Sequence, residues 1–424
     1  MIKFLFKGLL RDKNRSMLPI IVITIGVMLT VLLSGYIRGV MGDLVTQNAK
    51  FETGHVKVMT RAYAINKNQL PNDLAILGAD TMVEQLQSKF PDITWVKRIR
   101  FGGLMDVPDA NGETKAQGPV SGLAIELFNS AGGEVKRLQI AESIVDGNMP
   151  TKNGELLISD DFAKKLKLHV GDKITYFGST MNGSMVFKNF IISGTIRFGS
   201  PALDKGSIII DIADAQEMLD MQDATAEILG YFHNDIYNEE KSFNVSAEFN
   251  AQYANDTDEF APEMFPLKSQ NDLADYLDYV DSFAGLFVFI FILAMSVVLW
   301  NTGLIGGLRR YKEFGIRLAL GESKGKIYRS LIYEAVLIGI VGSVIGTAIG
   351  VAIVMWMQTY GIDISSYLEN STMMMPSVLK ARFTPDLLVI GFIPGLLAMV
   401  FGNMLSGIGI YKRQTATLFK ELEL

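Results

Sequence analysis

The 424-residue chain has no cysteine, only 3 histidines and only 20% charged residues. Without cysteine it cannot form disulfides, thiolate metal sites or iron–sulfur clusters, and it has no cysteine nucleophile. The histidines, His55, His169 and His233, lie far apart in the sequence and give little basis for a histidine metal site. A net charge of −6 lacks the basic excess that is typical of proteins that bind nucleic acid. We therefore expect no metal site and no nucleic-acid partner.

Motifs for nucleotide binding and hydrolysis are missing as well. The nearest approach to a phosphate-binding loop is 321–326, GESKGK, which has the wrong spacing and is followed by Ile327 instead of a hydroxyl residue. The HExxH, GxSxG and glycine-rich dinucleotide motifs do not occur. Adjacent acids such as Asp160 and Asp161 are expected to be helix caps or solvated surface. The sequence predicts neither enzymatic activity nor a cofactor bound by this chain.

Apolar residues make up 49% of the chain and gather in four long runs. A membrane-spanning helix needs about 20 apolar residues. The runs predict transmembrane helices at 17–41, 280–305, 331–357 and 386–410. The first run could instead be a secretory signal, but its apolar core is longer than such signals have and no small-x-small cleavage site follows it. We expect it to be an uncleaved anchor.

Charge is unevenly distributed between the spans and the segment that separates the first two. Residues 39–280 hold 35 acidic and 21 basic side chains, whereas the rest of the chain holds 10 acidic and 18 basic ones. The latter basic residues lie beside the spans, in segments 1–16, 306–330 and 411–424. By the positive-inside rule, these segments and both termini are cytoplasmic. Segment 42–279 and the loop at 358–385 are then external.

The external segment shows both strand and helix patterns. Short β-branched runs predict strands at 54–58, 155–159 and 207–211, and acidic caps predict helices at 161–166 and 214–219. Segments 173–177 and 186–196 flank a loop that contains Asn182-Gly183, a strong hairpin signal. Residues 238–272 are polar and show no clear periodicity. The expected fold class is a membrane α-helical protein with four transmembrane helices and a large extracytoplasmic α+β domain inserted between helices 1 and 2.

The third span carries glycines at a regular spacing. Gly342, Gly346 and Gly350 are four residues apart, so they share one helix face and favour close packing of a neighbouring helix. The general glycine richness of membrane helices is the alternative explanation. In the fourth span, Pro394 predicts a kink.

Polar residues within or beside the spans are candidates for substrate contact or for hydrogen bonds between helices, because burying them in lipid is costly. These candidates are Arg38, Asp281, Asn301 and Asn403. Glu334 is expected to lie one turn into the third helix, where it can reach cytoplasmic water or an interfacial arginine.

Two cytoplasmic segments have helical patterns. Residues 2–13 combine apolar and basic side chains and predict a short helix in the membrane interface, with a disordered basic leader as the alternative. Segment 308–322, LRRYKEFGIRLALGE, predicts a helix from about 309 to 320 that ends at Gly321. Attraction of its basic residues to lipid headgroups is one explanation of this segment, and contact with a partner is the other.

The sequence RRYKEFGIRLALG at 309–321 resembles the cytoplasmic signature of the ABC permease family that includes MacB, FtsX and the lipoprotein-releasing permeases LolC and LolE. Motifs of the external segment follow the order of that family, namely 146–148, 154–159, 162–166, 170–173, 190–194, 203–204 and 213–216. The segment at 54–58, GHVKV, is similar to the lipoprotein-release branch, which fits this chain best. The resemblance covers nearly the whole chain.

The resemblance implies a permease subunit without a nucleotide site of its own. Its coupling helix would dock on a separate cytoplasmic ABC ATPase, which would bind ATP and Mg²⁺. Carried over by position, the coupling residues are Arg309, Arg310, Lys312, Glu313, Gly315, Arg317 and Gly321. The family further implies a bacterial inner-membrane protein with a periplasmic MacB-like domain. It would pair with a second copy or a paralogous permease and extract lipoproteins or other amphiphiles from the outer leaflet by mechanotransmission.

The chain also departs from the family. MacB-type proteins carry a fused N-terminal ATPase, whereas this chain begins at the membrane, and the external domains of FtsX-type proteins are far smaller. The hairpin at 177–187 is short and lacks the proline-containing hook with which LolC binds its periplasmic chaperone. MacB-like export of an antibiotic, peptide or other amphiphile through a periplasmic adaptor is one alternative function. An FtsX-like regulatory scaffold for a cell-wall hydrolase is another, and an ATP-independent receptor is a third.

Overall fold

Contacts within the chain divide the computed structural model into two units. The model describes residues 13–109, 112–129, 132–233, 235–270, 273–308, 311–363 and 378–412. The membrane unit comprises Met1–Asp43, Asp278–Ile362 and Val378–Leu424, and the sheet domain comprises Leu44–Leu277 and Asp363–Ser377. The interfacial helix predicted at 1–16 falls mostly outside the described residues, as do the centre of the loop predicted at 358–385 and nearly all of the tail at 411–424.

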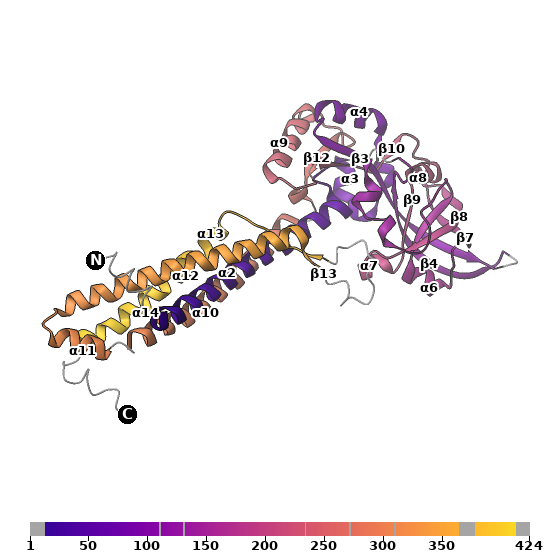
Figure 1. Ribbon diagram of the computed structural model, residues 1–424. Helices are drawn as coiled ribbons and strands as arrows, with labels where there is room; N and C mark the ends of the chain where they lie inside the picture. Colours follow the sequence, from indigo (N-terminus) through magenta and orange to yellow (C-terminus); the bar gives the residue numbers. More distant parts are fainter. Residues whose placement is uncertain are drawn as a thin grey trace. The chain divides into compact units, whose positions relative to one another are not determined.

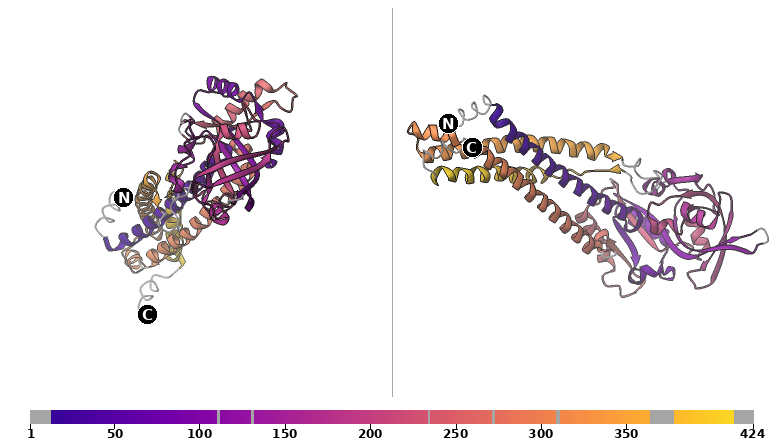
Figure 2. Two further views of the ribbon diagram at one scale, coloured as in Figure 1. Left: turned by 90° about the vertical axis from the view of Figure 1, so that its right-hand side faces the viewer. Right: turned by 90° about the horizontal axis from the view of Figure 1, so that it is seen from below.

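Within the described residues, the membrane unit is built mainly from long helices, and four helical stretches are long and apolar enough to cross a membrane. Its helices are α2 (Lys13–Asn48), α10 (Leu273–Leu308), α11 (Tyr311–Ala319), α12 (Lys324–Tyr360), α13 (Leu387–Ile390) and α14 (Phe392–Lys412). Each predicted span lies in one of the four, with α13 and α14 sharing the last. In Figures 1 and 2, α12 (orange) and α14 (yellow) run side by side.

The core of the membrane unit is a stripe of β-branched residues on α2. Ile23, Val27 and Val31 follow one another at intervals of four residues, so they face the same side of the helix. All three are buried in one cluster with Val354 of α12 and Met399 of α14. α2 therefore packs against both of these helices.

The last span is interrupted close to its proline. α13 ends at Ile390, Gly391 follows, and α14 begins at Phe392 with Pro394 in its first turn. Proline is tolerated there because the first N–H groups of a helix have no intrahelical partner, but its ring would clash with the carbonyl of Ile390 in a continuous helix. The sequence predicted a kink at Pro394, and the structure places a break at Gly391.

In the part of the chain that the structure describes, the sheet domain is built on one mixed sheet of ten strands. These are β1 (Val56–Thr60), β3 (Ile93–Pro108), β4 (Thr114–Ile125), β5 (Ile144–Gly147), β6 (Glu155–Ser159), β7 (Lys173–Ser179), β8 (Met185–Ile196), β9 (Ser207–Asp211), β11 (Glu227–Phe232) and β12 (Pro262–Pro266). Their order is β12-β1-β11-β3-β4-β9-β6-β8-β5, and β7 pairs with both β8 and β3. A separate two-stranded pair of this domain is formed by β2 (Ile76–Leu77) with β10 (Ala224–Thr225). Another pair, β13 (Ile362–Asp363) with β14 (Val378–Leu379), lies at the end of α12 and mostly in the membrane unit.

The long strand β3 belongs to two differently shaped lobes. Its first half, up to Arg98, pairs with β11 in an open antiparallel sheet. From Ile99 onward it pairs with β4, and residues 104–106 also pair with β7. Because β7 returns to β3, the pairing closes a ring of the six strands β3, β4, β9, β6, β8 and β7. We call the two parts the open lobe and the ring lobe.

Helices cover both lobes of the sheet domain (Figure 1). They are α3 (Arg61–Asn66), α4 (Ala79–Lys89), α5 (Glu134–Arg137), α6 (Asp160–Leu166), α7 (Pro201–Asp204), α8 (Ile212–Met218) and α9 (Glu239–Asn250). In the open lobe, Leu86 of α4 and Phe249 of α9 pack on strand residues such as Ile228. In the ring lobe, Phe162 of α6 and Ala215 of α8 join a core of strand residues. Each lobe therefore has its own apolar core.

The predicted α+β elements are confirmed within the described residues. The strands at 54–58, 155–159 and 207–211 correspond to β1, β6 and β9, and the hairpin corresponds to β7 and β8. The helices at 161–166 and 214–219 correspond to α6 and α8, and α8 has the predicted acidic cap, Asp211. The prediction of an acidic cap is wrong for α6, which is capped by Ser159, because Asp160 is buried in an ion pair with Arg197. The unassigned segment 238–272 forms α9 and β12. Together with the four apolar helices, this domain establishes the predicted fold class.

Candidate functional site

α11 contains most of segment 309–321, whose sequence resembles the permease signature. It spans Tyr311–Ala319 and is followed by Gly321 in the left-handed region, at φ 87°, in agreement with the predicted helix and its end. Phe314 is buried in a cluster with Ile327 and Leu331 of α12. This apolar contact holds α11 against the first turns of α12.

Leu318 packs against the same cluster, but two other apolar residues of this segment are exposed. Ile316 is 52% exposed and Leu320 is 82% exposed. They are four residues apart, so they lie on the same side of the segment. Neither residue was among the predicted coupling residues, which are charged residues and glycines; the spacing of four is in the sequence, but the exposure of the pair depends on which side α12 covers.

The predicted coupling residues are only partly described. Arg309 and Arg310 lie outside the described residues, and Lys312 is described only by its place in α11. Glu313 is half-buried, and Gly315 is buried next to Phe314 in the sequence. The structure thus leaves their coupling role as a prediction.

Arg317 forms an ion pair that braces the turn after α11. Its Nε and Nη2 atoms donate to the two carboxylate oxygens of Glu322 at 2.6 and 2.7 Å. These hydrogen bonds hold the pKa of the Glu322 carboxyl below its ordinary value. The Glu322 amide also donates to the Arg317 carbonyl at 3.0 Å, across Gly321. Arg317 therefore fixes the conformation that Gly321 permits.

The predicted glycine face of α12 lies against α2. A Cβ on Gly342 would be 2.8 Å from the Ile23 side chain, and one on Gly346 would be 2.6 Å from the Thr24 carbonyl oxygen. At Gly350 the nearest atom would be the Val31 Cβ at 2.9 Å. These distances are shorter than ordinary van der Waals contacts, so the two helices lie as close as glycine allows.

The polar candidates of the membrane unit have different surroundings. Arg38 forms an ion pair with Asp386, which stands just before α13. Asn403 is buried and donates to the Met399 carbonyl of its own helix at 3.0 Å. Asn301 is exposed, and Asp281 is described only by its place in α10. The structure does not bring the four together in one site.

Glu334 corrects one detail of the sequence analysis. The prediction that it lies one turn into its helix is wrong, because α12 begins at Lys324. The polar turns between Lys324 and Leu331 continue the same helix before the apolar run starts, so hydropathy alone placed the helix start too late.

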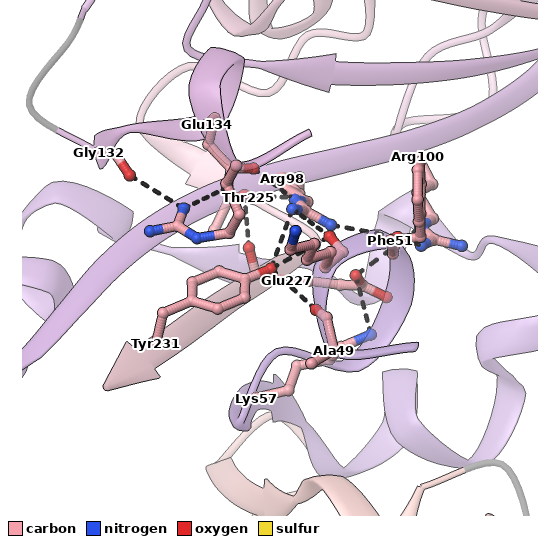
Figure 3. Close-up of polar contacts among 12 residues, drawn as sticks. Ala49, Phe51, Lys57, Arg98, Arg100, Gly132, Glu134, Thr225, Glu227 and Tyr231 are labelled. Atoms are coloured by element: carbon pink, nitrogen blue, oxygen red, sulfur yellow. Dashed lines mark hydrogen bonds and ion pairs between the residues drawn. The ribbon is translucent and has the colours of Figure 1, made fainter. Parts of the chain in front are cut away.

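A buried polar cluster surrounds the end of α2 within the sheet domain (Figure 3). α2 passes directly into a π-helical turn, Ala49–Thr53, and Gly54 then leaves the helix at φ 62°. The last carbonyl groups of a helix have no intrahelical partner. The Ala49 carbonyl accepts from the Gly54 amide at 2.9 Å, and side chains from elsewhere in the domain donate to it and to three further carbonyls of the turn. Tyr231 Oη donates to Ala49 (3.0 Å), Arg98 to Lys50 (2.7 Å) and Phe51 (3.1 Å), Arg100 to Phe51 (2.6 Å) and Gln270 to Thr53 (3.2 Å).

Arg98 is the centre of this cluster and is fully buried. Its Nε donates to Glu134 Oε2 at 2.6 Å, while its other nitrogens donate to carbonyls of the π-helical turn that follows α2. Burial acts to lower the pKa of Arg98, but the Glu134 carboxylate and the Tyr231 hydroxyl more than offset this effect, and the pKa is raised. Arg137 holds the second oxygen of Glu134 at 2.7 Å. Arg98 is therefore charged and fixed on both sides.

A second buried ion pair lies beside the first. Lys57 Nζ is 3.0 Å from Glu227 Oε2, and Arg100 Nε is 3.9 Å from the same oxygen. Burial lowers the pKa of Lys57 to about 8, against the raising effect of Glu227. Positive charge beside the carbonyl end of a helix is favourable, because that end of the helix dipole is negative. Arg98 and Arg100 thus place positive charge at the carbonyl end of α2.

Sequence reasoning missed the whole cluster. Lys57, Arg98 and Glu227 lie on strands, where charged residues ordinarily face solvent. Their partners come from segments up to 170 residues apart, so no local pattern shows the pairing. Burial of these charges depends on the end of α2, and only the three-dimensional structure reveals it.

Comparison with known proteins gives two family matches. Residues 16–252 match the MacB-like periplasmic core domain, and residues 285–415 match the FtsX-like permease C-terminal region. No curated protein sequence matches the chain. Among solved structures, the chain is similar to the periplasmic region of MacB from Actinobacillus actinomycetemcomitans, with 9% identity and a TM-score of 0.33, over 51% of this chain and 90% of that one.

Proposed function

Because the chain belongs to the MacB/FtsX family of ABC-transporter permeases, we propose that it couples ATP hydrolysis by a separate ATPase to the extraction of lipoproteins from the outer leaflet of the bacterial inner membrane. Permeases of this family are membrane subunits that work with a cytoplasmic ABC ATPase. The ATPase would bind ATP and Mg²⁺. The permease would act as a dimer with a second copy or a paralogous permease.

The observation that carries the proposal is the arrangement of α11. One side of this helix is fixed to α12 through Phe314, while Ile316 and Leu320 stand exposed. A helix fixed on one side and apolar on the other is suited to receive a force from a bound partner and to pass it into α12. The basic segment 306–330 is cytoplasmic by the positive-inside rule, on the side where an ATPase would be.

The choice of lipoprotein as substrate is supported by the resemblance of 54–58, GHVKV, to the lipoprotein-release branch. In the structure this segment follows directly on the turn that ends α2 and opens β1. A stroke carried along α2 would therefore reach this segment first. Export through a periplasmic adaptor and control of a cell-wall hydrolase are the other outcomes of the test below.

The test is purification of the chain from its native membrane in mild detergent, with identification of the retained proteins. We expect an ABC ATPase, a second permease copy or paralogue, and acylated lipoproteins. An adaptor or duct protein in place of lipoproteins would indicate export, and a hydrolase would indicate a scaffold. If no ATPase is retained while the permease dimer stays intact, the proposal is wrong.

Two variants connect that result to α11. Ile316→Asp combined with Leu320→Asp is expected to reduce the retained ATPase about ten-fold, because apolar residues at the centre of an interface contribute most of its binding energy. Ile65→Asp is the matched control, since Ile65 is 83% exposed and lies in α3 of the sheet domain. Equal recovery of the ATPase from the double variant and the control would contradict docking through α11.

A further inference from the structure

The two chain segments that lead into and out of the sheet domain are tied together at one place. Gln270, which precedes α10, donates through Nε2 to the carbonyls of Thr53 (3.2 Å) and Phe265 (3.1 Å). The Leu267 amide donates to the His55 carbonyl at 3.1 Å. Leu267 is also fully buried against Ala49. The end of α2 and the approach to α10 therefore share one set of contacts.

Arg98 connects the same place to the sheet. Its guanidinium bonds two carbonyls of the turn that ends α2, and its backbone lies in β3, opposite Glu227 of β11. Hydrogen bonds of an ionised group are roughly twice as strong as neutral ones, and the planar fork of arginine fixes their direction. Displacement of this turn relative to β3 would break these bonds inside a buried site.

The position of Arg98 along β3 determines which strands would be displaced when the Arg98 side chain is pulled. Arg98 is the last residue that pairs with β11, and Ile99 is the first that pairs with β4. The side chain thus joins β3 at the boundary between the open lobe and the ring lobe. Movement at this point reaches both lobes through one continuous strand.

From these contacts we infer that Arg98, Arg100 and Gln270 form a clamp that transmits displacement of α2 and of the approach to α10 to both lobes of the sheet domain. This inference rests on the proposed function, since it assigns residues to its stroke. The three are positioning residues: they transfer motion and contact no reacting group.

The test compares three variants of the full chain, purified with its native ATPase. Arg98→Met and Gln270→Met remove donors to the end of α2. Arg137→Met is the matched control, because Arg137 bonds the same Glu134 carboxylate but donates to Gly132 and not to α2. Hydrogen exchange over Ile93–Ile125 is measured without nucleotide and after trapping with ATP and orthovanadate. The ATP hydrolysis rate and the thermal midpoint are measured in parallel.

The clamp predicts a specific loss of coupling. Arg98→Met and Gln270→Met should hydrolyse ATP at rates close to the wild-type rate. The ATP-dependent change in hydrogen exchange should fall about five-fold, because coupling between two sites typically changes an equilibrium by at least this factor. Arg137→Met should keep the change. Gln270 is neutral, so its replacement leaves no buried charge unpaired and separates coupling from misfolding.

Other results overturn the inference in distinguishable ways. Equal losses in Arg98→Met and Arg137→Met, in proportion to their lowered thermal midpoints, would mean that the cluster only stabilises the fold. An unchanged response in both Arg98→Met and Gln270→Met would mean that force takes another route. If the wild-type complex hydrolyses ATP but shows no exchange change in residues 44–277, the proposed function fails, and the clamp fails with it.

Discussion

His55 shows how single residues of the sheet domain are fixed by burial. Its ring lies among Tyr231, Phe232 and Tyr237, and its Nδ1 accepts a hydrogen bond from the Phe232 amide at 3.0 Å. A protonated Nδ1 could not accept this bond. Burial lowers the pKa of His55 to about 4, opposed by Asp235 and aided by Arg137. The folded domain therefore requires the neutral imidazole.

This requirement predicts acid sensitivity of the sheet domain. Because the pKa of His55 is lower in the folded state than in the unfolded state, the unfolded state binds more protons between about pH 6.5 and 4, and stability falls as pH falls through that window. At pH 5 the loss should be about 2 kcal/mol relative to pH 7. Hydrogen exchange of peptides from residues 44–277 in the full chain measures it.

His55→Asn is expected to remove most of this pH dependence, because the amide oxygen of asparagine can accept from Phe232 at any pH. His169→Asn serves as the control, since the His169 side chain is 85% exposed. If His55→Asn and His169→Asn lose the same stability between pH 7 and pH 5, another group is responsible.

Among the elements, the pairing of α2 with α12 depends on how closely their backbones approach. The three glycines of α12, Gly342, Gly346 and Gly350, are four residues apart and leave one face of the helix without side chains. β-Branched residues of α2 pack against this face. β-Branched side chains lose little rotamer freedom when buried in this way. The β-branched side chains of α2 form a ridge, and the glycine face of α12 forms the groove in which this ridge packs.

Gly346→Leu is expected to lower the stability of the membrane unit by about 1–3 kcal/mol, because added volume in a packed contact forces the backbones apart. Unfolding of the purified full chain by heat in detergent gives the comparison. Ile349→Leu on the same helix is the control, since Ile349 is 41% exposed and the change conserves volume. Identical midpoints for the two variants would show that the glycine face does not set the packing.

Elements with a local signal were predictable from the sequence, and elements that depend on distant partners were not. β6, β9 and α6 have short apolar runs or caps that identify them. β3 was missed because Gly102 and Gly103 interrupt its pattern and its charged residues look solvent-facing. On α11, the helix and its glycine end were predicted, but the exposed pair Ile316 and Leu320 emerged only once α12 showed which side is covered.

For the whole molecule, the predicted topology places α11 and the sheet domain on opposite sides of the membrane. The chain has no cysteine, so single cysteines report on position without background. Ile65 and Leu320 are 83% and 82% exposed, which makes them a matched pair. In intact spheroplasts, a membrane-impermeant maleimide should label Ile65→Cys, and it should label Leu320→Cys only after permeabilisation. Labelling of both before permeabilisation would contradict the positive-inside assignment.

The pairing of β1 with β12 has a consequence for how such proteins diversify. β1 follows the end of α2, β12 precedes α10, and the two strands are antiparallel neighbours, with Val56 opposite Pro266. The first and last strands of the domain are therefore neighbours, and the two ends of the inserted segment lie close together. Gain or loss of such an insert leaves only a short gap to close, at little entropic cost. A permease of this architecture could therefore gain, lose or replace its sheet domain while its membrane helices stay the same.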